Sequence, residues 1–327
     1  MTYNIILLRI SKMITNKIVN EVCNDNIHSP KPIVKWVGGK TQIIDKIISD
    51  FPVHINNYRE IFLGGGSVLL TLLSYVKNDI IRIHGKIYAY DLNESLIYMY
   101  KNIQTNCDEL YLELQNIITD FNNCDNGEIN RNPTNINEAK VAKENYYYWI
   151  RNKYNNLEDK QSITCSAMFL FLNKTCFRGL FRVGPKGFNV PYGHYKNPTI
   201  INKEHLDEIH NLIQNVNFEC EDFNSSLLNI EDNDFTYLDP PYAPETETSF
   251  VGYTKDGFNH DQHTNLFKLI HELTDKNKKI MLSNADVSLV RENFTDKKYN
   301  TISITCKRTI NSKKPDAKTT EVIIRNY

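Results

Sequence analysis

A strand, a glycine-rich loop and a helix follow one another between residues 58 and 73. Residues 58–62 favour a strand, the loop is Leu63-Gly64-Gly65-Gly66-Ser67, and apolar residues 68–73 begin a helix. Glycines let a ligand approach the backbone closely, and a helix N-terminus supplies free N–H groups. This unit predicts an α/β fold that binds a nucleotide-like ligand at the loop. Leu69 stands where the dinucleotide pattern requires its third glycine, so a smaller adenosine ligand is favoured over a dinucleotide.

A second strand is expected at residues 87–90, and it ends in Asp91-Leu92-Asn93. An acidic residue at the end of the strand after a glycine loop is placed to accept hydrogen bonds from both hydroxyls of a ribose. Residues 92–119 are expected to form one or two helices, because apolar residues recur there with helical spacing. The asparagine-rich stretch 121–138 is expected to be a surface loop and a domain boundary.

The buried-strand pattern of residues 235–238 stops abruptly at Asp239-Pro240-Pro241-Tyr242. Prolines lack a backbone N–H, so the strand is expected to end here. Open α/β sheets build their active sites at the carboxyl ends of strands, which makes Asp239 a candidate catalytic residue. A stiff turn with a purely structural role is the alternative for these residues taken alone.

A further glycine turn, Trp36-Val37-Gly38-Gly39-Lys40, precedes a predicted amphipathic helix at residues 43–48. Trp36 is suited to stack on a ring, and Lys40 is suited to reach an anionic group. The alternative is a simple turn beside a core tryptophan. The spacing of glycine and lysine excludes a P-loop.

Positive charge is concentrated in residues 160–203, which hold seven Lys or Arg and no Asp or Glu, although the net charge of the chain is −1. Aromatic residues are interleaved with these cations, and Gly184-Pro185-Lys186-Gly187 is the predicted tip of a hairpin. Cations suit phosphate contacts and aromatic rings suit base contacts, so the segment predicts a nucleic-acid surface. A solvated loop that happens to lack acids is the alternative.

The C-terminal part of the chain is expected to complete the sheet. The predicted elements are strands at 218–223 and 279–284, a helix at 261–274, and two alternating strands at 300–307 and 320–325. The last two strands suggest a closing antiparallel hairpin, joined by a second cationic loop at 308–318.

Cysteine, histidine and apolar patterns exclude several classes. Seven scattered cysteines with no C-x-x-C pair favour reduced thiols in a cytosol-like compartment over disulfides or a zinc site. His260 and His263 lack the acidic partner of a H-E-x-x-H motif, so they are expected to be polar residues at a helix start and no metal is expected. No apolar run approaches the roughly 20 residues that span a bilayer. Residues 4–8 are too short an apolar run to suggest a signal peptide, so no membrane partner is expected.

These motifs together resemble the Dam family, the D12-class S-adenosylmethionine-dependent DNA adenine-N6 methyltransferases. The matching stretches, in the family's order, are Lys35-Trp36-Val37-Gly38-Gly39-Lys40, Phe62-Leu63-Gly64-Gly65-Gly66-Ser67, Asp91-Leu92-Asn93, Arg178-Gly179-Leu180-Phe181-Arg182, Phe188-Asn189-Val190-Pro191-Tyr192-Gly193, Asp239-Pro240-Pro241-Tyr242, and Glu321 with Asn326-Tyr327. The resemblance covers residues 31–327 and implies S-adenosyl-L-methionine as cofactor and double-stranded DNA as partner. A cognate restriction endonuclease is a further candidate partner.

The resemblance also implies a fold and a domain organisation. The fold is a Rossmann-like class I methyltransferase sheet of seven strands with a C-terminal antiparallel hairpin. The implied domains are an N-terminal extension at 1–30, a catalytic domain at 31–125 and 216–327, and an inserted helical and β-hairpin target-recognition domain at 126–215. The expected location is the cytoplasm, or wherever the target DNA resides, including a virus-infected host cell.

Roles carry over to individual residues. The implied catalytic residues are Asp239, Pro240 and Tyr242. The implied cofactor-binding residues are Trp36, Lys40, Phe62, Gly64, Gly65, Gly66, Asp91, Asp222, Phe223 and Asp239. With the basic segment, the resemblance predicts DNA contact by Lys174, Arg178, Arg182, Lys186, Asn189, Pro191 and Tyr192.

Two departures from the family bear on the target sequence. Arg178 stands where the best-known members carry Asn, and the hairpin tip at 183–187 is about one residue short. Arg182 and Pro191 match positions that contact the guanine-adenine end of the target in those members. A target in which guanine precedes the methylated adenine is therefore favoured, whereas GATC itself does not follow.

The residue types suit methylation of an exocyclic amine. The Asp239 carboxylate and the Pro240 carbonyl can each accept one N6–H, which frees the nitrogen lone pair, and Tyr242 can stack on a base flipped out of the duplex. Cytosine-N4 methylation uses the same chemistry but more often has Ser in place of Asp239. RNA or protein methylation, catalytically silent DNA binding and nicotinamide-dependent oxidoreduction are less favoured functions for the same set of motifs.

Overall fold

The chain folds around one seven-stranded sheet. In the computed structural model, which describes residues 27–244, 258–307 and 318–327, the strand order is β10-β11-β9-β8-β2-β4-β7. Strands β9, β8, β2, β4 and β7 run parallel, whereas β11 is antiparallel to both β9 and β10. The strands are β2 (Tyr58–Ile61), β4 (Ile87–Asp91), β7 (Val216–Cys220), β8 (Phe235–Leu238), β9 (Lys279–Ala285), β10 (Asn300–Lys307) and β11 (Lys318–Arg325). The predicted α/β class is confirmed, and the sheet is mixed.

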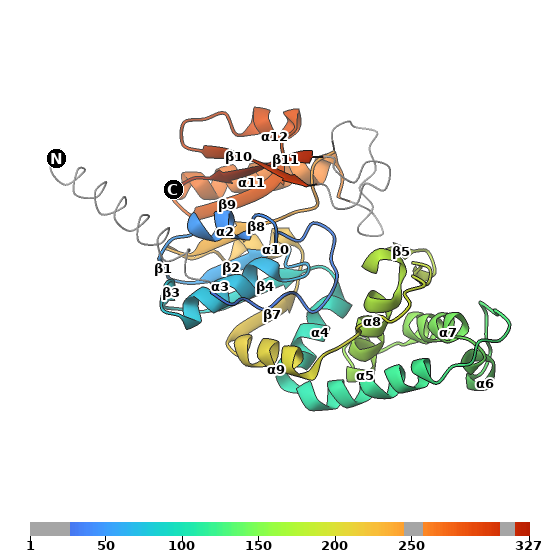
Figure 1. The fold of residues 1–327 in the computed structure, drawn as a ribbon. Coiled ribbons are helices and arrows are strands. Elements are labelled where there is room, and N and C mark those ends of the chain that lie inside the picture. Colours follow the sequence, from blue (N-terminus) through green and yellow to red (C-terminus); the bar gives the residue numbers. More distant parts are fainter. Residues whose placement is uncertain (1–26, 245–257, 308–317) are drawn as a thin grey trace, which may run out of the picture.

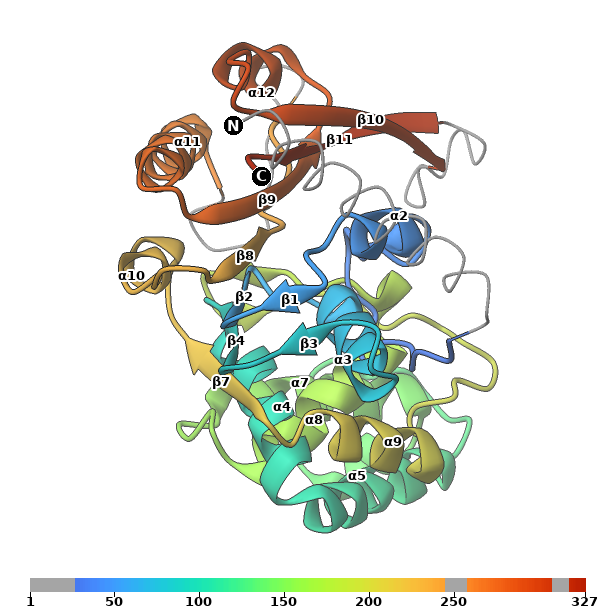
Figure 2. The same cartoon turned by 90° about the vertical axis from the view of Figure 1, so that its left-hand side faces the viewer.

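Helices cover both faces of this sheet. Figure 2 shows α10 and α11 on one face and α2 and α3 on the other. The helices around the sheet are α2 (Ile44–Ser49), α3 (Ser67–Lys77), α10 (Phe223–Leu228), α11 (His260–Asp275) and α12 (Ser288–Asn293). Parallel strands covered on both faces are buried throughout, and every residue of β2 and β8 is buried. Two short parallel strands, β1 (His54–Ile55) and β3 (Arg82–Ile83), form a separate ribbon.

A group of helices lies to one side of the sheet (Figure 1). Its members and neighbours are α4 (Glu94–Thr105), α5 (Cys107–Asn122), α6 (Ile136–Lys140), α7 (Lys143–Asn156), α8 (Ile163–Thr175) and α9 (Lys203–Leu212). Helix α8 is apolar around most of its circumference because it packs against α4, α5 and α7. Helix α4 also packs on β4 and β7 and thereby connects the helical group to the sheet. The predicted surface loop at 121–138 begins as the last turn of α5 and ends within α6.

The described part of the chain has neither a membrane-spanning helix nor a metal-binding cluster. Within residues 27–244, 258–307 and 318–327, no helix has the length and apolar character needed to cross a bilayer. The same residues include no group of three or more His, Cys, Asp and Glu arranged to hold a metal ion. The cysteines among them are free thiols. Residues 1–26 of the predicted extension and most of the cationic loop, 308–317, lie outside the described residues.

The two histidines at the start of α11 differ from each other. His260 is exposed where the helix begins, after Asn259 caps it, as expected of a polar helix-start residue. His263 also lies in the first turn of α11, but it is fully buried against Phe258 and Phe267 and does not face solvent. Burial lowers the pKa of His263 to about 4, so the ring is neutral at pH 7 and serves as part of the core.

Candidate active site

The carboxyl ends of three adjacent strands meet at one edge of the sheet. Strand β2 pairs in parallel with both β4 and β8, and the three end nearly in register. Phe62 follows β2, Asp91 ends β4, and Asp239 follows β8. The structure therefore brings together the glycine loop, the predicted ribose-binding acid and the Asp-Pro-Pro-Tyr turn, although they lie far apart in the sequence.

The glycine loop needs glycine at two positions for steric reasons. Gly64 has φ +51° and Gly66 has φ +71°, a left-handed backbone that side chains with a Cβ rarely adopt. A Cβ on Gly64 would lie 2.9 Å from Cδ1 of Trp36, and one on Gly66 would lie 2.7 Å from the hydroxyl of Tyr100. Gly66 is also the N-cap of α3, so the loop ends at the unpaired N–H groups of that helix.

Asp91 binds the glycine loop directly. Its Oδ2 accepts from the backbone N–H of Gly64 at 2.9 Å, and its Oδ1 accepts from the backbone N–H of Asn93 at 2.9 Å. Burial raises the pKa of Asp91, and these backbone donors act in the opposite direction. Each carboxylate oxygen has two lone pairs, so Asp91 keeps acceptor capacity for a ligand hydroxyl.

A buried ion pair joins Lys40 to Asp239. The Nζ of Lys40 lies 2.7 Å from Oδ2 of Asp239, and the two side chains are 2% and 19% exposed. The same Nζ donates to the Gly38 carbonyl at 2.7 Å. Burial raises the pKa of Asp239 to about 6, although Lys40 acts to lower it. The anionic group that Lys40 reaches is thus Asp239, a partner that the sequence did not identify.

The second oxygen of Asp239 has a different environment. Oδ1 is buried and has no hydrogen-bond partner among the described residues. A buried acceptor without a donor costs about 1–3 kcal/mol, so this atom favours an incoming N–H or O–H group.

Glu60 is a second buried acid near Asp239, and sequence reasoning missed it. It lies on β2, and its Oε2 accepts from the Tyr58 hydroxyl at 2.7 Å. Burial raises the pKa of Glu60 to about 8, and the negative charge of Asp239 adds to this effect. Glu60 therefore carries a proton at pH 7 and adds no second full charge beside Asp239. Its place near the end of the strand that leads into the glycine loop was the only signal in the sequence.

The turn after Asp239 is held by residues of β9 and β11. The Tyr242 hydroxyl donates to Oε2 of Glu321, and the backbone N–H of Ala243 donates to Oδ1 of Asn284 at 3.0 Å. Lys40 Nζ lies 4.7 Å from the centroid of the Tyr242 ring. Sequence reasoning assigned no role to Asn284 and noted Glu321 only within a matching motif, because neither contact is local.

Three aromatic rings pack together at Phe62, which precedes the glycine loop. The ring centroid of Phe62 lies 5.8 Å from that of Phe223 and 5.7 Å from that of Phe258, and the last two rings are 5.6 Å apart. Asp222 is exposed and caps α10, because its Oδ1 accepts from the N–H groups of Asn224 and Ser225. The predicted cofactor residues at the ends of β2 and β7 are thus neighbours.

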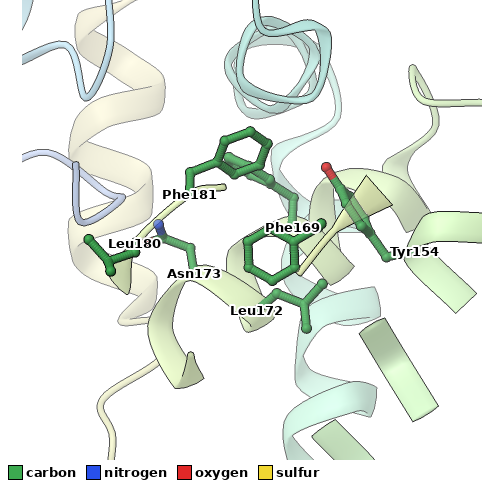
Figure 3. Close-up of a pocket in the computed structure, with 7 residues that line it drawn as sticks. Tyr154, Phe169, Leu172, Asn173, Leu180 and Phe181 are labelled. Carbon is green, nitrogen blue, oxygen red and sulfur yellow. The ribbon is translucent and has the colours of Figure 1, made fainter. Parts of the chain in front are cut away.

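Trp36 connects the glycine loop to the basic segment. Its ring stacks on Phe181 with centroids 5.5 Å apart, and it contacts the positions where Gly64 and Gly65 would carry a Cβ. The neighbouring Lys35 is held by Asn173 of α8, which accepts from its N–H at 2.8 Å and donates to its carbonyl at 2.9 Å. Figure 3 shows that Phe181 and Leu180 line a small pocket together with Phe169 and Asn173 of α8.

The predicted hairpin is present. Strands β5 (Val183–Gly184) and β6 (Gly187–Phe188) pair in antiparallel fashion around the predicted tip, after a 3₁₀ turn at Phe177–Gly179. Asn155 of α7 anchors β6, because it accepts from the N–H of Phe188 and donates to its carbonyl. The predicted DNA-contact residues that are exposed here are Arg178, Arg182, Lys186, Asn189 and Pro191.

Three other basic-segment residues have surroundings that limit their contact with DNA. Tyr192 was expected at the DNA surface but is buried against Phe121 of α5 and Tyr147 of α7, so its ring belongs to the core of the helical group. Lys174 is partly buried, and burial lowers its pKa to about 8. Lys203 forms ion pairs with Asp108 and Asp207, so acidic side chains from outside the basic segment lie next to it in the folded chain.

Comparisons with known proteins cover most of the chain. The family model described as D12 class N6 adenine-specific DNA methyltransferase matches residues 36–310. Type II methyltransferase M.MjaIII of Methanocaldococcus jannaschii is 36% identical over 310 residues, which span 91% of this chain and 99% of that protein. Type II methyltransferase M1.LlaDCHI of Lactococcus lactis subsp. cremoris is 31% identical over 304 residues, with 91% and 95% covered. The DNA adenine methylase of Escherichia coli strain K12 is 29% identical over 299 residues, also with 91% and 95% covered.

Proposed function

Because this chain belongs to the D12 class of N6 adenine-specific DNA methyltransferases and methylates adenine N6 in DNA, we propose that the reaction takes place at Asp239. The observation that carries this proposal is the pair of Asp239 oxygens, of which Oδ2 is bound to Lys40 and Oδ1 is buried without a partner among the described residues. The methyl donor we propose is S-adenosyl-L-methionine, which when bound supplies an electrophilic methyl group on a positively charged sulfur.

The residues around the glycine loop fit such a donor. Gly64 lets the Trp36 ring pack directly against the loop backbone, because a Cβ at that position would collide with the ring, and the loop ends at the unpaired N–H groups of α3. Asp91 has acceptor capacity for ribose hydroxyls, and Phe62 and Phe223 offer apolar faces for an adenine ring. The proposed donor-binding residues are Trp36, Lys40, Phe62, Gly64, Gly65, Gly66, Asp91, Asp222, Phe223 and Asp239.

Asp239 activates the adenine amine in this proposal. The amine is a weak nucleophile because its lone pair is delocalised into the ring. Oδ1 of Asp239 accepts one N6–H and the Pro240 carbonyl accepts the other, which localises the lone pair on nitrogen. Lys40 engages Oδ2, so Oδ1 is the oxygen left for the amine. Methyl transfer releases one proton from N6, and Asp239, whose pKa burial raises to about 6, takes it at Oδ1.

The target base has to leave the duplex before it reaches this site. An amine inside the stack is inaccessible, and enzymes that modify bases flip the nucleotide out at a cost of a few kcal/mol. Tyr242 is half-buried next to Asp239 and offers a ring for the flipped adenine. Stacking on an aromatic ring stabilises a base by about 1–3 kcal/mol, which offsets part of that cost.

The basic hairpin is the proposed DNA-contact surface. Its exposed residues combine two arginines and a lysine with Asn189 and Pro191 around a two-residue tip, which suits both phosphates and base edges.

We assign 126–215 to target recognition and 31–125 with 216–327 to a catalytic domain of Rossmann-like methyltransferase topology. The similar proteins from M. jannaschii and L. lactis are named Type II methyltransferases, so a restriction endonuclease with the same target is a candidate partner. The proposed site of action is the cytoplasm or another compartment that holds the target DNA.

Transfer of a labelled methyl group to duplex DNA tests the proposal. Wild-type protein is expected to form N6-methyladenine, and Asp239→Ala is expected to lose at least about a hundredfold in rate. Asp232→Ala is the matched control, because this exposed aspartate lies at the opposite end of β8. Undiminished transfer by Asp239→Ala, or N4-methylcytosine as the product, would contradict the proposed chemistry.

A further inference from the structure

The two residues after the Pro-Pro turn are anchored to two different strands. Ala243 donates its backbone N–H to Oδ1 of Asn284 on β9 at 3.0 Å, and Tyr242 donates its hydroxyl to Oε2 of Glu321 on β11. Asn284 is fully buried and Glu321 is half-buried. Glu321 stands opposite Ala285 in the antiparallel register, so the two anchors are close neighbours on the sheet. The segment therefore has a fixed backbone and a fixed side chain.

Lys40 adds a third restraint on Tyr242. Its ammonium lies 4.7 Å from the ring centroid and also forms the ion pair with Asp239. A cation over one face of a ring leaves the opposite face for a stacking partner. With its face on Lys40 and its hydroxyl on Glu321, the ring of Tyr242 has one orientation relative to the Asp239 carboxylate.

We propose that Glu321 is a positioning residue that holds the ring of Tyr242 in the orientation that receives the flipped-out adenine. This inference rests on the proposed function, in which Tyr242 stacks on the target base. Glu321 does not touch the base and acts only through the Tyr242 hydroxyl. A ring that is already held loses less conformational freedom when the base arrives, and such preorganisation strengthens binding.

The proposal predicts an effect opposite in sign to simple electrostatics. Glu321→Ala removes a negative charge, and loss of a carboxylate near a DNA site would by itself tighten binding of the DNA polyanion. If the hydroxyl anchor matters, the KM for DNA instead rises about two- to tenfold, the factor that corresponds to one freed side chain. Glu321→Gln removes the same charge but keeps an acceptor for Tyr242, so it is expected to retain a KM near that of the wild type.

Steady-state methylation and base-flipping fluorescence provide the readouts. The substrate is a duplex whose methylated adenine has first been mapped with the wild-type protein, and a second duplex carries 2-aminopurine at that position. Glu321→Ala is expected to raise the KM for DNA and to reduce the rise in 2-aminopurine fluorescence, with the Kd for S-adenosylmethionine unchanged. Glu292→Ala is the matched control, because Glu292 is an exposed glutamate on α12.

A double-mutant cycle with Tyr242→Phe separates positioning from a general structural role. Tyr242→Phe removes the hydroxyl and keeps the ring, so the double variant should be no worse than Tyr242→Phe alone if Glu321 acts through that hydroxyl. Additive effects, or equal KM changes in Glu321→Ala and Glu321→Gln, would overturn the inference. Tyr242→Phe keeps the test open should Glu321→Ala fail to fold. A wild-type protein that transfers no methyl group to DNA would instead overturn the proposed function.

Discussion

Replacement of Lys40 by methionine tests whether the ion pair keeps Asp239 ionised for catalysis. Burial raises the pKa of Asp239 to about 6 even with the ammonium of Lys40 at 2.7 Å. A neighbouring opposite charge lowers a carboxyl pKa by about 1–3 units, so Lys40→Met should move the pKa of Asp239 to about 7–9. The ionised fraction at pH 7 then falls from about nine-tenths to between about one-half and one-hundredth, and methyl transfer falls with it.

The assay is the pH dependence of kcat/KM for methyl transfer. Transfer requires the ionised carboxylate, so activity decreases as the pH falls through the pKa of Asp239. In the wild type this decrease is expected near pH 6. In Lys40→Met it should appear about 1–3 units higher, and activity should recover in alkaline buffer. Lys46→Met is the matched control, because Lys46 is an exposed lysine on the neighbouring helix α2.

The Kd for S-adenosylmethionine separates this effect from a direct contact between Lys40 and the donor. If Lys40→Met lowers methyl transfer only because it binds the donor more weakly, activity returns at saturating donor and the pH dependence stays where it is in the wild type. An unshifted acid limb in Lys40→Met, with normal donor affinity, would refute the assigned role of the ion pair.

The other predictions concern stability, the glycine loop and the hairpin. Burial raises the pKa of Glu60 to about 8, so the folded chain holds a proton that the unfolded chain releases near its ordinary pKa. The proton on Glu60 stabilises the folded state fully below the pKa that Glu60 has in the unfolded chain. This stabilisation is lost at about 1.4 kcal/mol per pH unit as the pH rises toward 8. Glu60→Gln should remove this pH dependence from the unfolding free energy measured with urea. Gly64→Ala is expected to cost about 1–2 kcal/mol in unfolding free energy and to weaken donor binding in calorimetry, because its φ is +51°, whereas Gly39→Ala should change neither. Arg182→Ala should relax sequence preference in methylation mapping, whereas Lys186→Ala should weaken DNA binding uniformly and reduce its salt slope by about 1; unchanged preference in both variants would refute the hairpin assignment.

Local patterns predicted the elements that local forces determine. Prolines after residues 235–238 predict the end of β8, and β8 ends at Leu238. The glycine run before residues 68–73 predicts the start of α3, because Gly66 adopts the left-handed backbone that forms its N-cap. The Gly-Pro-Lys-Gly tip predicts the β5–β6 hairpin, because glycine and proline favour the backbone conformations of a tight turn. In each case the signal and its structural cause lie within a few residues.

Contacts between distant segments account for what the sequence did not predict. The sequence predicted that Lys40 reaches an anionic group but did not identify Asp239 as that group, because only the folded sheet places the first glycine turn over the end of β8. Tyr192 alternates with cations in the sequence, yet packing against α5 and α7 buries its ring. Nothing in the local sequence marks Glu60 as protonated, because burial within the folded sheet is what raises its pKa.

The order of strands in the sheet explains how the proposed site is divided. Phe62, the glycine loop, Asp91, Asp222 and Phe223, which are proposed to bind the methyl donor, lie at the ends of β2, β4 and β7, on one side of β8. The anchors of Tyr242 lie on β9 and β11, on the other side. Asp239 follows β8 itself, so its carboxylate lies between the donor side and the base side. It follows that variants on β11 should change DNA parameters and leave donor affinity intact, and that variants of the glycine loop should do the reverse. Because Lys40 contacts both Asp239 and the ring of Tyr242, it is the residue whose replacement should affect both.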